Sequence, residues 1–181
     1  PKFFLIDSYS ELTDQMFINR NNISRFCSNY SDLEHNDEFN NIFSENGLIS
    51  NDILEDSYRI FFNFINLKFN TPPIIFIHFP VKLDNREKFK LRYKSILIAI
   101  NNLKNEFDNL VSIEIDENVV NWPEYKISDL EKFPYHFNYN TYKYFAKQLY
   151  FIVNIFAYII NIFIFFINKN LIYTFIRPIY S

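Results

Sequence analysis

The sequence predicts an α/β domain over residues 1–147, in which helices pack on a parallel sheet, and an apolar tail over residues 148–181. Two short runs of consecutive apolar residues, Phe3–Ile6 and Ile74–Phe79, are typical of strands that a parallel sheet buries on both faces. Longer segments with apolar residues at steps of three and four alternate with them, as amphipathic helices do. This alternation favours parallel pairing through right-handed crossovers.

The segment after the first strand gives weaker signals. Ser10–Ile18 is compatible with a short helix. Residues 19–56 are rich in Asn, Ser and Asp and have few periodic apolar positions, so we expect a long loop with one or two helical turns.

The second half of the domain is clearer. A helix is expected over Ser57–Phe69, since Thr71-Pro72-Pro73 ends it. The strongest helical pattern covers Arg86–Phe107, and Val111–Ile115 alternates like a strand near a sheet edge. Three strands are few for such a sheet, so we expect further strands upstream of Pro1.

Composition argues against several classes of function. The net charge is −3, and the alternation of Lys88, Lys90, Arg92 and Lys94 predicts a solvated helix face, so no nucleic-acid partner is expected. Gly47 is the only glycine, which excludes the glycine-rich loops that cradle phosphates. With Cys27 as the only cysteine and three histidines that lack metal-ligand spacing, we expect neither a cofactor nor a bound metal.

The tail carries an uncharged stretch, Gln148–Asn168, which exceeds the roughly 20 residues that span a bilayer as a helix. Tyr150–Ile167 is apolar on all sides, so we expect it to contact a membrane and the protein to be membrane-associated, otherwise cytoplasmic. The alternative is that strong codon bias produced the run, as in the tail of a partial gene product.

Polar side chains follow the expected strands where ligands bind in open parallel sheets, beyond the carboxyl ends. Asp7 and Ser8 follow the first strand, His78 lies in the second, and Asp116 follows the third. Tyr135 and His136 belong to a late loop. A hydroxyl, an imidazole and carboxylates at one rim are the groups that acyl transfer requires. The structural alternatives are that Ser8 caps a helix and that His78 is a hydrogen-bonded core residue.

Two short segments carry a family resemblance. Ile6–Ser10 resembles the Gly-Asp-Ser nucleophile block of the SGNH (GDSL) hydrolase superfamily, and Phe133–Asn138 resembles the block that supplies its catalytic acid and base. The resemblance implies a flavodoxin-like parallel sheet and an esterase or acyltransferase acting on an acylated polysaccharide. In it, Ser8 would be the nucleophile and His136 the general base.

In the same resemblance, Asp7 or Asp129 would orient or support the base. The substrate-binding candidates are His78, Asp116 and Tyr135, because of their place at the expected rim. The sequence departs from the family pattern, because Ile6 replaces the glycine, Phe133 stands where the acid belongs, and no Gly-x-Asn-Asp block exists. These departures favour the alternative of a catalytically inactive SGNH-like domain that binds a glycan or anchors a complex at a membrane. In a second register, Phe3–Asp7 is the middle strand of the family and the nucleophile lies upstream.

Overall fold

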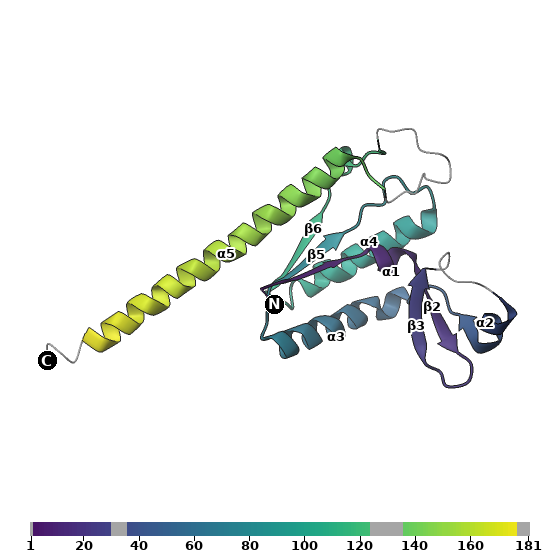
Figure 1. The fold of residues 1–181 in the computed structure, drawn as a ribbon, viewed down its shortest axis with the longest axis horizontal. Helices are drawn as coiled ribbons and strands as arrows, with labels where there is room; N and C mark the ends of the chain where they lie inside the picture. The colour runs from purple at the N-terminus through teal and green to yellow at the C-terminus, as the bar shows by residue number, and fades with distance from the viewer. Residues whose placement is uncertain (1, 30–35, 124–135, 177–181) are drawn as a thin grey trace. The chain divides into compact units, whose positions relative to one another are not determined.

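A computed structural model describes residues 2–29, 36–123 and 136–176, with side chains described as far as Tyr158, Asn29 and Ala157 excepted. It confirms an α/β fold with a three-stranded parallel sheet and helices packed on it (Figure 1). The chain forms two compact units, Pro1–Asn138 and Tyr139–Ser181, and each is described by itself. The division falls at the start of the last helix.

The parallel sheet contains β1 (Phe4–Asp7), β5 (Ile74–His78) and β6 (Leu110–Glu114) in the order β1-β5-β6. All three predicted strands are therefore confirmed. β5 is central because its apolar, largely β-branched run suits a strand that is paired on both edges. The register sets Asp7 beside Ile77 and His78 beside Glu114, so the three strands end at the same edge.

The first strand differs from its prediction in one respect. It was expected to be buried on both faces, but its residues alternate, and the side chain of Leu5 is 48% exposed. Among the described residues β1 pairs only with β5, which makes it an edge strand in this sheet. A strand with one neighbour has less of its surface covered than a central strand of similar composition.

Helices α3 (Asn51–Phe69) and α4 (Glu87–Leu103) cover one face of this sheet. Three ring contacts define that face, with centroid distances of 4.8 Å for Phe4–Phe69, 5.4 Å for Tyr58–Phe76 and 6.1 Å for His78–Tyr93. The helix predicted over Arg86–Phe107 is confirmed as α4. The helix predicted from Ser57 begins six residues earlier, at Asn51, and ends where Asn70 adopts a left-handed conformation (φ 60°) before the prolines.

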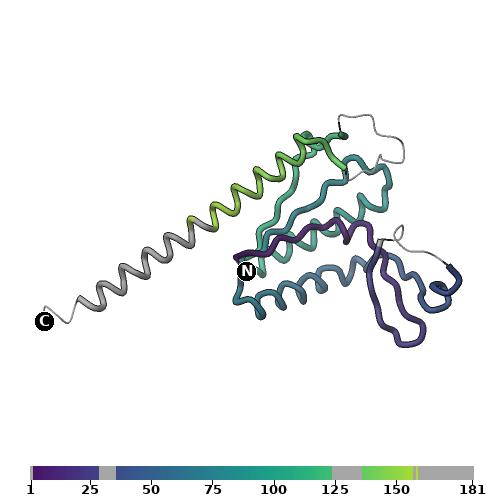
Figure 2. Tube along the Cα trace, in the orientation of Figure 1, coloured from purple at the N-terminus to yellow at the C-terminus, as the bar shows by residue number. Residues whose placement is uncertain are grey.

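Between β1 and α3 the predictions were wrong. Ser10–Ile18 is not one helix, because α1 (Tyr9–Thr13) ends and β2 (Asp14–Asn19) begins within it. Instead of a long loop, residues 19–56 contain β3 (Arg25–Asn29), α2 (Asp37–Ile42), β4 (Phe43–Glu45) and the first turns of α3. β2, β3 and β4 form an antiparallel sheet in the order β3-β2-β4, whose course can be followed in Figure 2.

Aromatic packing explains how so polar a segment forms a sheet. Phe17 of β2 stacks on Phe26 of β3 at 5.3 Å, and the edge of Phe39 meets Phe17 at 5.4 Å. Phe26 and Phe43 meet at 5.2 Å. These four rings come from four elements, so the cluster forms only when the strands pair. No local sequence pattern therefore predicts it.

After β6 the chain makes one 3₁₀ turn, η2 (Glu117–Val119), and the second unit contains α5 (Tyr139–Ile176). The backbone is helical throughout the predicted span Tyr150–Ile167, but the side chains from Ile159 onward lie outside the described residues. Over the residues that are described, none of the helices has the length and apolar character that crossing a bilayer requires.

Candidate ligand-binding site

The carboxyl edge of the parallel sheet brings several of the predicted residues together. The backbone N–H of Ser8 donates to the carbonyl of Ile77 at 3.1 Å, so the chain leaving β1 stays beside the end of β5. The ring of Phe79 contacts Tyr9 at 5.2 Å and Phe137, in the late loop, at 5.5 Å. Thus Phe137, which follows His136, packs beside the end of β5.

Ser8 has a structural role at that edge. Its side chain is fully buried, and its Oγ accepts the backbone N–H of Phe79 at 2.9 Å. Ser8 stands at the N-cap position of α1, yet its side chain makes no capping bond to that helix. The hydroxyl instead joins the ends of β1 and β5, which satisfies a backbone donor at the point where β5 leaves the sheet.

His78 is a core residue, although not the hydrogen-bonded one that was expected. The side chain is fully buried, its ring lies 5.1 Å from Phe76, and neither ring nitrogen has a partner among the described residues. Burial, with a smaller contribution from the positive charge of Lys104, lowers the pKa of His78 to about 4. The imidazole is therefore neutral at physiological pH.

The other predicted residues lie at the surface or outside the described part. The Asp7 carboxylate accepts the N–H of Tyr9, and that of Asp116 accepts the N–H of Asn118, each at 2.9 Å, so both close local turns. His136 is exposed and directly precedes Phe137, which is buried against Phe79. Tyr135, Phe133 and Asp129 lie outside the described residues.

The sequence analysis missed an ion pair between α4 and α1, in which the arginine is buried and the glutamate is half-buried. Arg92 of α4, predicted on a solvated face, is buried and pairs with Glu11 of α1. Its Nη1 also donates to the carbonyl of Ile49 at 2.6 Å and to Oδ1 of Asn51 at 2.7 Å. The helical period gave the missing signal, because Arg92 falls in the same stripe as Phe89 and Ile96, which are both buried.

Beside Glu11 there is a cavity of about 200 Å³. Its walls come from α1 and from one face of α3, where residues spaced by three and four positions line up. The lining residues are Glu11, Leu54, Ser57, Tyr58 and Phe61. A carboxyl group, two hydroxyl groups and apolar walls therefore surround one small space, a composition typical of small-molecule sites.

Burial shifts the pKa of two polar groups that line the cavity, those of Glu11 and Tyr58. Burial raises the pKa of the Glu11 carboxyl, while the charge and hydrogen bonding of Arg92 oppose the rise and Asp14 adds to it. Burial and the nearby Glu11 carboxylate likewise raise the pKa of the Tyr58 phenol. Tyr58 therefore remains a neutral hydroxyl group, able to donate and accept. The Ser57 hydroxyl donates to the carbonyl of Ile53 at 2.8 Å, which leaves its oxygen available as an acceptor.

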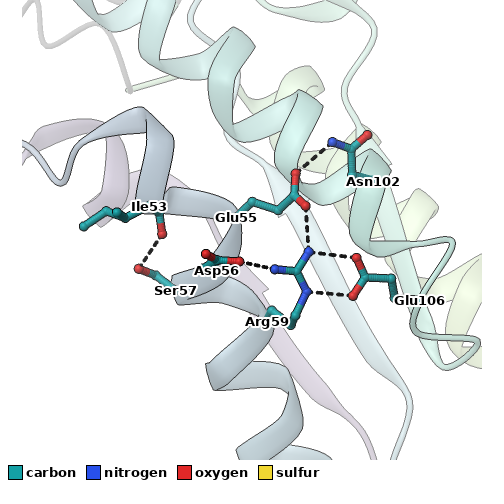
Figure 3. Close-up of polar contacts among 7 residues, drawn as sticks. All are labelled: Ile53, Glu55, Asp56, Ser57, Arg59, Asn102 and Glu106. Carbon is teal, nitrogen blue, oxygen red and sulfur yellow. Dashed lines mark hydrogen bonds and ion pairs between the residues drawn. The ribbon is translucent and has the colours of Figure 1, made fainter.

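The polar side of α3 holds the helix in place (Figure 3). Arg59 donates to both carboxylate oxygens of Glu106, at 2.7 and 2.8 Å, and also pairs with Glu55 and Asp56. Asn102 of α4 donates to Glu55 at 2.7 Å. These hydrogen bonds to Glu106 and Glu55 raise the pKa of the Arg59 guanidinium, and the bond from Arg59 lowers that of the Glu106 carboxyl. Since the network joins α3 to α4, it fixes which face of α3 lines the cavity.

The single cysteine shows no sign of activation. Cys27 is exposed on β3, and partial burial together with the charges of Glu11 and Asp14 raises the pKa of its thiol. A raised pKa leaves less of the reactive thiolate at neutral pH.

No protein-family model, no curated protein and no solved structure matches this chain.

Proposed function

We propose that this chain is a non-catalytic α/β domain that binds one sugar unit of a glycan in the cavity between α1 and α3. The carrying observation is the lining, which sets Glu11, Ser57 and Tyr58 beside the ring of Phe61. A sugar offers hydroxyl groups that both donate and accept, and a C–H face that packs on an aromatic ring.

The burial of Ser8 supports a binding role over a catalytic one. A nucleophile has to reach its substrate, whereas the Ser8 side chain is fully buried and its oxygen accepts the Phe79 N–H. The neutral imidazole of His78 is likewise enclosed by the core. Ser8 joins the ends of β1 and β5, and neither side chain lines the cavity.

The size of the cavity sets the expected affinity. About 200 Å³ is smaller than the usual site for a drug-sized ligand and suits a single ring. At about 0.3 kcal/mol per non-hydrogen atom, such a ligand would bind with a Kd on the order of 1 mM. A glycan chain would gain further affinity if neighbouring units also touched the protein.

The test is a titration of the full chain with N-acetylglucosamine, glucose and galactose, followed by saturation-transfer NMR. We expect saturation transfer from wild type to at least one sugar. Phe61→Ala should lose this transfer, and Tyr58→Phe should show a weaker transfer. Phe64→Ala is the matched control, because Phe64 is an exposed phenylalanine of α3 that does not line the cavity. Equal signals in Phe61→Ala and Phe64→Ala would overturn the proposal.

The ester hydrolase implied by the SGNH resemblance is the second candidate. One observation favours it: Phe137 packs on Phe79, which brings the loop of His136 to the rim where Ser8 lies. The test is hydrolysis of p-nitrophenyl acetate by the full chain. The hydrolase is favoured over the binding role if the full chain hydrolyses the ester faster than buffer alone and both Ser8→Ala and His136→Ala abolish that activity. A rate that His136→Ala leaves unchanged would remove it.

The membrane contact predicted for Tyr150–Ile167 is a further proposal. Its basis is the uncharged run that begins after Lys147, combined with unbroken helical backbone in α5. Flotation of the full chain with phosphatidylcholine vesicles tests it. We expect co-flotation that survives high salt, while recovery of the protein in the bottom fraction would contradict it.

A further inference from the structure

Helix α3 has a second apolar face that is exposed. Ile60, Phe64 and Leu67 are 71%, 57% and 89% exposed, and Ile53 precedes Ile60 by two turns on the same side. We call these four residues the α3 outer face. The spacing of seven, four and three residues places them in one stripe, the pattern of a helix that packs against another helix.

This face is distinct from the one that packs on the sheet. Leu54, Phe62 and Ile65 form the inner stripe and are buried. On the polar side, the hydrogen bonds from Arg59 to Glu106 join α3 to the turn that follows α4 (Figure 3). With the helix held from two directions, the α3 outer face cannot turn inward, and its exposure is a property of the folded domain.

We propose that the α3 outer face is the interface of a homodimer, in which the α3 helices of two copies pack antiparallel. A two-fold axis between Ile60 and Phe64 sets Ile60 of each copy against Phe64 of the other. Leu67 then lies level with Ser57 of the second copy, at the edge of the cavity lining, so the dimer and a bound sugar compete for this part of α3. A stripe that complements itself under a two-fold rotation is what an isologous interface requires.

The charges of α3 favour the antiparallel arrangement. The first half carries Asp52 and Asp56, while Lys68 is the basic residue of the last turn. Antiparallel packing sets the acidic half beside Lys68 of the second copy and opposes the two helix dipoles. Parallel packing would bring the acidic halves together, where like charges repel.

The available area fits a reversible dimer. The α3 outer face exposes on the order of 500 Å² of largely apolar surface, against roughly 800 Å² per partner in a standard interface. Association should therefore depend on protein concentration.

The first experiment measures the mass of the full chain in mild detergent by light scattering over a hundredfold range of concentration. We expect a monomer–dimer equilibrium, and in Ile60→Asp a dissociation constant raised roughly 100-fold. Ile98→Asp is the matched control, because Ile98 is 61% exposed and lies on α4, outside the α3 outer face. A wild-type monomer throughout, or a dimer that Ile60→Asp leaves intact, would overturn the proposal.

The second experiment fixes the orientation with a short bis-maleimide in a Cys27→Ser background, which removes the one native thiol. An Ile53→Cys chain and a Leu67→Cys chain of different mass are treated separately and as a mixture. We expect cross-linking mainly between the two different chains. Cross-linking of Ile53→Cys with itself would mean a parallel pair. If chains with this face intact float with phosphatidylcholine vesicles as monomers and Ile60→Asp does not, the face binds lipid and the dimer proposal fails.

Discussion

Arg92, which is buried, and Glu11, whose side chain is 24% exposed, form an ion pair that joins α4 to α1 across 81 positions of the chain. The same guanidinium holds the carbonyl of Ile49 and the side chain of Asn51, at the start of α3. One side chain therefore sets the relative positions of the three helices around the cavity, and Glu11 is both its partner and part of the lining.

Removing one partner of this pair should be costly. In Arg92→Met the Glu11 carboxylate and the Ile49 carbonyl lose their donor, and we expect a loss of about 3–5 kcal/mol in the free energy of unfolding. The double variant Arg92→Met/Glu11→Leu should regain much of that loss, since it leaves no unpaired charge. Urea unfolding measures both, and a double variant as unstable as the single one would contradict this account.

Arg59 provides the comparison for that measurement. Its ion pairs lie at the surface, since the side chains of its partners Asp56 and Glu106 are 71% and 44% exposed. Solvent and salt screen such contacts, so Arg59→Met should be much less destabilising than Arg92→Met in the same urea titration. Added salt should narrow the difference between Arg59→Met and wild type. An effect as large as that of Arg92→Met would show that the network in Figure 3 is essential to the fold.

Ser8→Ala should affect stability and leave sugar binding intact. The substitution leaves the Phe79 N–H without its acceptor in a buried position, which costs roughly 1–3 kcal/mol. Ser10→Ala, at an exposed position of α1, is the control and should be nearly neutral. Thermal unfolding and the sugar titration are run on the same samples. Loss of binding in a folded Ser8→Ala protein would mean that the hydroxyl contacts the ligand.

The buried imidazole of His78 predicts a pH-dependent loss of stability. In the unfolded chain the pKa of His78 is about 6.5, and in the fold burial lowers this pKa to about 4. As the pH falls from 6.5 towards 4, only the unfolded state takes up the proton, so the fold loses stability, by roughly 3 kcal/mol in total. Above pH 6.5 the contribution does not change.

The measurement compares wild type with His78→Leu. Urea midpoints are recorded between pH 4 and pH 8 for both proteins, and their difference isolates His78 from the carboxyl groups that titrate in the same range. We expect the stability of His78→Leu to rise relative to that of wild type as the pH falls from 6.5 to 4. Parallel curves would mean that the ring nitrogens reach water or a hydrogen-bond partner.

The elements that the sequence predicted well have local signals. β5 is an apolar run bounded by prolines, and α4 has apolar residues at helical spacing over its whole length. β2 and β3 lack such a signal, since Asp14, Gln15 and Arg25 lie in strands of a small sheet that is partly solvated on both faces. Their pairing depends on rings such as Phe39 and Phe43, which are distant in sequence.

The site was predicted in part for a similar reason. Strand ends in a parallel sheet meet at one edge, so the proximity of Asp7 and Ser8 to the end of β5 followed from the order of elements. The cavity did not follow, because Glu11 and the residues of α3 that line it meet only through tertiary packing. Arg92 was predicted on the solvated face because it alternates with lysines, whereas its helical spacing from Phe89 and Ile96 places it on the buried face.

The most direct test of the account is saturation-transfer NMR on wild type, Phe61→Ala and Phe64→Ala with the sugar that gives the strongest wild-type signal. If a sugar packs on Phe61, transfer occurs in wild type and Phe64→Ala and is lost in Phe61→Ala, with all three proteins folded by circular dichroism. Transfer that survives in Phe61→Ala, or that no sugar gives with wild type, would contradict the account.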